Sequence, residues 1–115
     1  MFYGCKNLTV FNCVNLSSLT DGITMFKDCY GLTAFDYDLS SLNRGWNMFW
    51  GCYSLTAFSS NLSSLTEGKN MFEDCYGLTT FDSDLSSVTN GDNMFENCYS
   101  LTAFNCDDLS SLTSG

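Results

Sequence analysis

The chain has 115 residues and a formal net charge of −9, from 13 acidic and 4 basic side chains, with no proline and no histidine. This acidity disfavours nonspecific attraction to nucleic acid and to anionic membrane surfaces, so we expect neither partner. The sequence has no apolar run of about 18 residues, and we therefore expect no membrane insertion by this segment.

The chain is dominated by a repeat. The string M-F-x-x-C-x-x-L-T-x-F begins five times, at spacings of 24, 23, 23 and 23 residues. A fixed period of about 20 to 50 residues is typical of solenoids, in which each unit buries its apolar face against a neighbour. We predict one solenoid block, excised from a longer repeat protein or built to stack, with the repeats 1–24, 25–47, 48–70, 71–93 and 94–115.

Each repeat is expected to hold the same short elements, illustrated by the second. Met25, Phe26 and Cys29 have the spacing of a single turn of helix or 3₁₀ helix. Residues 32–35 favour a short strand, and residues 39–42 a second extended segment that carries two core leucines. Gly45 is predicted to close the coil with a positive φ. The equivalent glycines are Gly22, Gly68, Gly91 and Gly115.

The core is predicted to consist of ladders of identical side chains. Stacked coils place like residues about 4.8 Å apart, the spacing of paired strands. The ten phenylalanines fall into two columns of the repeat, and Met, Cys and Leu recur at fixed positions beside them. We therefore expect columns of Met, Phe, Cys and Leu to fill the interior.

The strings M-F-x-x-C-x-x-L-T-x-F and D-L-S-S-L-T-x-G resemble the repeat of BspA-like bacterial surface-protein leucine-rich repeats, over the entire chain. The resemblance implies a right-handed leucine-rich-repeat solenoid of five coils. It also implies an extracellular or cell-surface location, in a bacterial or phage-encoded protein, and a role in adhesion or partner binding. The partner would be a protein or a glycan.

Two sets of cysteines have different expected roles. One lies in a repeat column and is expected to be buried and free. Cys13 and Cys106 each follow a column Phe by two residues, in the only two repeats with an extra residue there. Four coils separate them, about 19 Å at strand spacing, so they cannot pair within one chain. They either fill a bulge or meet in an end-to-end contact between two copies.

Oxygen-bearing side chains recur in the turn after each predicted strand. Such ladders can bind Ca²⁺, which takes six to eight oxygen ligands. The spacing matches no known calcium loop, however, and a solvated turn explains the same residues. The weak calcium candidates are Asp36, Asp38, Asp82, Asp84, Asp107 and Asp108.

Aromatic residues outside the core columns are the candidate interaction surface. A tyrosine follows the column Cys in four repeats and should point outward. Exposed aromatic side chains make good interface anchors, although stacked tyrosines can equally serve stability alone. The candidates are Tyr30, Tyr53, Tyr76, Tyr99, Trp46 and Trp50.

Catalysis is not expected, because the chain has no His, one Arg and three Lys, and so offers no nucleophile–base pair and no phosphate loop. No cofactor is expected. The leading hypothesis is a non-enzymatic interaction or adhesion solenoid. The alternatives are a structural unit that stacks end to end through uncapped coils and, more distantly, a calcium-binding module.

Overall fold

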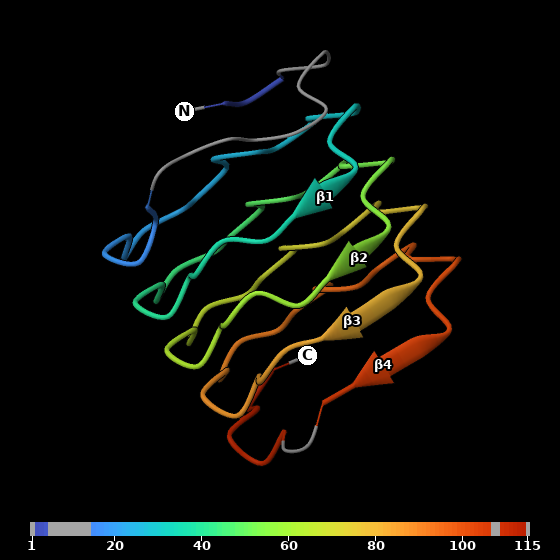
Figure 1. Cartoon of the computed structure of the whole chain (residues 1–115). Coiled ribbons are helices and arrows are strands. Elements are labelled where there is room, and N and C mark those ends of the chain that lie inside the picture. Colours follow the sequence, from blue (N-terminus) through green and yellow to red (C-terminus); the bar gives the residue numbers. More distant parts are fainter. Residues whose placement is uncertain (1, 5–14, 107–108, 115) are drawn as a thin grey trace.

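A computed structural model describes residues 2–4, 15–106 and 109–114. Its regular structure is one parallel sheet of four short strands in the order β1-β2-β3-β4. The strands are β1 (Ala34–Phe35), β2 (Ala57–Phe58), β3 (Thr80–Asp82) and β4 (Ala103–Asn105). Figure 1 shows the sheet along one side of a stack of similar coils, with tight turns on the other side. The described part of the chain is a repeat solenoid, as predicted.

The strands pair in a register of whole repeats. Phe35 lies opposite Phe58, Phe58 opposite Phe81, and Phe81 opposite Phe104. A second ladder of isolated parallel bridges connects the coils away from the sheet, through Asp21, Arg44, Glu67, Asn90 and Ser114. Because every rung joins residues one repeat apart, equivalent side chains lie directly above one another.

The two phenylalanine columns form interlocking ladders in the core. Phe26, Phe49 and Phe72 stack with ring centroids 5.5 and 5.4 Å apart. Phe58 fits between Phe49 and Phe72 with its ring turned edge-on, at 5.3 and 4.8 Å. These are the stacked and T-shaped arrangements that aromatic rings prefer. The Met, Cys and Leu columns of the middle coils are buried beside them, as predicted.

The predicted helical turn is not confirmed, because the described residues contain no helix. Around Met25 the backbone forms consecutive turns, in which Met25 N donates to Gly22 O and Cys29 N donates to Phe26 O. The intervening amides of Phe26 and Asp28 donate instead to carbonyl groups of the next coil. A helix would use all of these amides within one coil. The turns leave every second amide to hold two coils together.

The second extended segment was predicted wrongly. Leu39 and Leu42 are buried as expected, but Leu42 N donates to Leu39 O at 2.9 Å, which makes residues 39–42 a turn. The two serines between the leucines fit the ends and corners of turns better than a strand.

The reason given for the repeated glycines was also wrong. Gly22, Gly45, Gly68 and Gly91 do not have positive φ, whereas Gly4 and Gly51 do. A Cβ on Gly45 would lie 2.9 Å from the sulfur of Met71, so this glycine makes room for the next coil. Gly115 lies outside the described residues. Positive φ occurs two residues later, at Thr24, Asn47, Asn70 and Asn93.

Candidate functional site

The tyrosines that follow the column Cys form a stacked ladder on the outside of the coils. We call Tyr30, Tyr53, Tyr76 and Tyr99 the tyrosine ladder. Its ring centroids are 4.7, 4.9 and 5.7 Å apart, and successive rings are within 11° of parallel. Tyr53 and Tyr76 are about two-fifths exposed, and Tyr99 is 78% exposed. The predicted outward direction of the column is therefore confirmed.

The pKa values of the two middle tyrosines of the ladder are raised. Partial desolvation raises the pKa of Tyr53, and the adjacent Tyr30 and Tyr76 rings and the Asp28 and Asp74 carboxylates raise it further. The pKa of Tyr76 is raised in the same way, with Asp74 the main charge beside it. The raised pKa values favour the neutral phenol at Tyr53 and Tyr76.

A cation lies between aromatic rings beside this ladder. Lys27 Nζ lies 4.3 Å from the centroid of the Trp50 ring and 5.1 Å from that of Tyr3. The indole Nε1 of Trp50 donates to Asp74 Oδ2 at 3.1 Å, and Asp74 Oδ1 accepts from Asn97 Nδ2 at 2.7 Å. These contacts link residues of five successive repeats and hold the Trp50 indole in place.

Trp46 belongs to a separate group of residues. Its Nε1 donates to Glu67 Oε2 at 3.0 Å, and the Arg44 guanidinium lies 5.0 Å from its ring centroid. Arg44 also pairs with Asp21 at 3.2 Å. The two tryptophans were predicted to belong to one aromatic surface, but each is fixed by its own partners.

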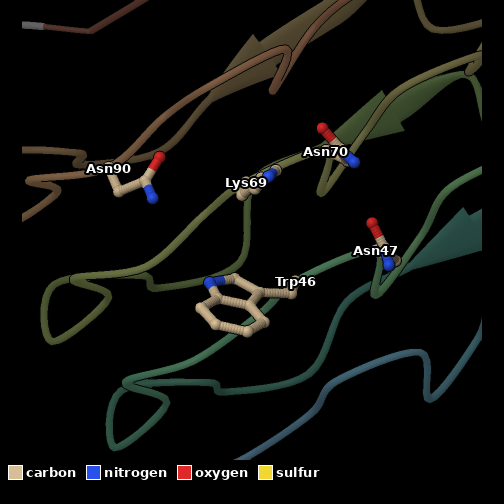
Figure 2. A pocket seen from close by; sticks show the side chains of 5 residues that line it. All are labelled: Trp46, Asn47, Lys69, Asn70 and Asn90. Carbon is tan, nitrogen blue, oxygen red and sulfur yellow. The ribbon is translucent and has the colours of Figure 1, made fainter. Parts of the chain in front are cut away.

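A groove of about 400 Å³ runs beside Trp46 across three coils. We call it the Trp46 groove, and Figure 2 shows the side chains that line it, with Asn47 and Asn70 on neighbouring turns. Both of these asparagines have a buried Oδ1 atom that accepts no hydrogen bond from the described residues. The lining residues are Trp46, Asn47, Lys69, Asn70 and Asn90.

Of these groove residues, only Trp46 was predicted from the sequence as a candidate. A signal was nevertheless present, since Asn47, Asn70 and Asn93 recur at one position of the repeat, two residues after a glycine. Asn is the residue other than Gly that adopts positive φ most readily. The three have φ of 56°, 55° and 54°.

The column cysteines have a bonding role that the sequence did not reveal. Cys29, Cys52 and Cys75 are buried and free, as predicted. The Sγ of Cys52 donates to Phe26 O and that of Cys75 to Phe49 O, both at 3.2 Å, which joins successive coils. Burial raises the pKa of Cys98 to about 11 and raises those of Cys52 and Cys75 further.

The cysteines of the predicted end-to-end contact are only partly described. Cys106 is free, partly buried and packed against the apolar core, in the column of Ser60 and Ser83. Cys13 lies outside the described residues. The contact between them therefore stays a prediction.

The described aspartates of the predicted calcium ladder stay in their turns. Asp38 Oδ1 accepts from Ser40 N at 2.9 Å, and Asp84 Oδ1 accepts from Ser86 N at 2.8 Å. Asp36 and Asp82 are exposed. Over residues 2–4, 15–106 and 109–114, no three metal-ligating side chains come together. Asp107 and Asp108 lie outside these ranges.

Comparison with known proteins gave one match. The model of the family described as "BspA type Leucine rich repeat region" matches residues 1–114 in six copies, one more than the Met-Phe starts in the sequence. No curated protein and no solved structure matches the chain. Within its described part, the structure has no helix with the length and apolarity needed to cross a membrane.

Proposed function

Because this chain belongs to the BspA-type leucine-rich repeat family, we propose that it is a non-enzymatic interaction solenoid of the adhesion type. In this proposal it is part of a surface-exposed bacterial or phage-encoded protein. Its five repeats hold the tyrosine ladder and the neighbouring Trp50 as a rigid binding face for a protein or a glycan. The family match supports the interaction role, and the exposed ladder supports the location of the face on the coils.

The observation that carries the proposal is the exposure of aromatic rings that are stacked on one another. An aromatic side chain has two χ angles, so it loses little conformational entropy when a ligand covers it. The Tyr53 and Tyr76 rings already lie 4.9 Å apart and nearly parallel, which reduces that cost further. A face fixed before binding gains affinity because less ordering is needed.

We expect the double variant Tyr53→Ala/Tyr76→Ala to bind at least tenfold more weakly to ligands retained by the native chain on an array of purified glycans and secreted proteins. The matched control is Thr56→Ala/Thr79→Ala, which changes two exposed side chains in the same coils. Melting temperatures measured in parallel separate the two roles of the ladder. If the tyrosine variant melts lower but binds every array ligand as tightly as the native chain, the ladder serves stability alone and the proposal fails.

The C-terminal end of the stack supports a second candidate function, end-to-end self-assembly with a second copy of this chain. Phe104, Leu109 and Leu112 are 41%, 44% and 36% exposed. Their counterparts one repeat earlier, Phe81, Leu85 and Val88, are at most 2% exposed. Within the chain, residues at these positions are covered by the equivalent residues of the next coil. The sequence of the first repeat has the same residue types at these positions, so the first coil of a second copy could cover the exposed end.

We expect the native chain to sediment as dimers and larger assemblies as its concentration rises, and Leu112→Asp to sediment as a monomer. A carboxylate at an apolar contact is costly to bury without a partner. Ser111→Asp is the control, because it adds the same charge at a neighbouring exposed position. A native chain that stays monomeric at every concentration contradicts self-assembly. The contact of Cys106 with Cys13 of a neighbour belongs to this candidate and would give a dimer on non-reducing gels.

A further inference from the structure

We propose that the C-terminal end of the stack contains a socket for a methionine residue, and that Met1 of a second copy of this chain occupies it. The inference rests on the end-to-end assembly proposed above and names the residue that enters the contact. It is carried by the way in which the coils already bind the methionines of their neighbours.

Three methionine side chains of the described coils each lie against a glycine of an earlier repeat. A Cβ on this glycine would come within 2.8 to 3.0 Å of the methionine sulfur, so the glycine leaves the space that the thioether fills. The pairs are Gly22 with Met48, Gly45 with Met71, and Gly68 with Met94.

The backbone of the same methionines is also bound by the preceding coil. Phe26 N donates to Met48 O, and Phe72 N donates to Met94 O, both at 2.9 Å. An incoming methionine is therefore recognised twice, through its side chain at a glycine and through its carbonyl at the amide of a phenylalanine four residues after that glycine.

The last socket of the series, at Gly91 and Phe95, is open. β4 belongs to the last coil of the stack (Figure 1), and the sequence after Met94 contains no further methionine. The atom nearest to a Cβ on Gly91 is Leu112 Cδ1 at 3.1 Å, in place of a methionine sulfur. The Phe95 amide donates to no acceptor in the described part of the chain.

An apolar cavity of about 120 Å³ lies at this position. A cavity of about 150 Å³ with apolar walls is enough to bind benzene, so this one suits the four heavy atoms of a methionine side chain. Methionine is unbranched and polarizable, and it fills irregular apolar gaps well. The walls include Gly91, Met94, Phe95, Phe104 and Leu112.

The charge distribution favours the N-terminal end of the second copy as the partner. Lys69 is the one basic residue of residues 58–115, which contain most of the acidic residues. Two C-terminal ends would therefore repel each other, because like charges brought together oppose association. The other basic residues all lie in the first two repeats. Met1 lies outside the described residues, but a first repeat added in register places it after Met94 in the methionine column.

The test compares the sedimentation of the native chain and three variants, each released from a cleavable leader so that it begins at residue 1. Gly91→Val fills the socket, and Met1→Gln replaces the thioether with a polar side chain of similar length. We expect each to associate at least tenfold more weakly than the native chain. Ser111→Val is the matched control, because it adds the same side chain at an exposed position that does not line the cavity, and it should associate normally.

A mixture of the two weakened variants gives the sharpest measurement. Gly91→Val keeps its first repeat and Met1→Gln keeps its socket, so the mixture should form dimers that neither variant forms alone, and no longer assemblies. Melting temperatures at a concentration where the chains are monomeric check the fold. If Gly91→Val does not fold, Met1→Gln tests the same contact from its other side.

Three results would overturn the methionine socket: a mixture that stays monomeric, native association by Met1→Gln, or equal weakening by Ser111→Val. If one of these occurs while the native chain still assembles and Leu112→Asp does not, end-to-end assembly stands and only the socket is lost. A native chain that stays monomeric contradicts the assembly and the socket together.

Discussion

Replacing Phe58 with alanine is expected to lower the free energy of unfolding by about 3–5 kcal/mol. The Phe58 ring is 1% exposed and stacks between Phe35 and Phe81, at 6.0 and 5.8 Å. Loss of the ring removes apolar burial and leaves a void. The void cannot collapse easily, because the hydrogen bonds between coils fix their separation. Urea unfolding followed by circular dichroism measures the change.

Phe104→Ala is the matched control for Phe58→Ala. It removes the same ring from the same column in the last coil, where the side chain is 41% exposed, stacks on Phe81 and packs edge-on against Phe95. We expect a loss of about 1–2 kcal/mol, since less apolar area leaves water and the end can relax. Equal losses at Phe58 and Phe104 would show that a middle coil does not depend on having two neighbours.

Raising the pH above about 9 is expected to destabilise the protein through its buried thiols. Burial raises the pKa of Cys52 and Cys75 in the folded state above the ordinary thiol value of 9.0, so the unfolded chain loses these protons first. Their stabilisation is therefore complete below pH 9 and is lost as the pH rises. Each such thiol should contribute a slope of up to about 1.4 kcal/mol per pH unit.

The double variant Cys52→Ala/Cys75→Ala tests the origin of this slope. The variant removes these two thiols and their electrostatic effect on the neighbouring Cys29 and Cys98, so the difference in slope between pH 8 and 10 belongs to the buried cysteine column. Urea unfolding under reducing conditions at each pH gives the slopes. Identical slopes for the variant and the native chain would mean that these thiols ionise as readily in the fold as in the unfolded chain.

The repeat predicts the interior of the middle coils well because burial there follows column position. Phe26, Phe49 and Phe72 occupy one position of the repeat and are all fully buried. Repetition also predicted the outward direction of the tyrosines, since the preceding cysteine points inward. Any feature that depends only on place within a coil is visible in the sequence.

The groove could not be predicted because it depends on how different columns meet across coils. Trp46 and Lys69 occupy one repeat position with very different side chains, and Asn90 comes from another position in the next coil. Their relation is set by the turn conformation around Asn47 and Asn70. We predicted a helical turn from the next residue, Met48 or Met71, and no particular conformation for these asparagines. Periodicity cannot distinguish a helical turn from consecutive turns that alternate their hydrogen bonds.

The repeat position directly after the Phe of M-F-x-x-C holds a different side chain in almost every repeat. It reads Tyr3, Lys27, Trp50, Glu73 and Glu96. Since each coil is joined to its neighbours by the same backbone rungs, exchanging or duplicating one 23-residue segment would reorder these surface groups without disturbing the interior. Recombination within the gene could therefore change the order of these surface side chains while the backbone rungs and the core columns are kept.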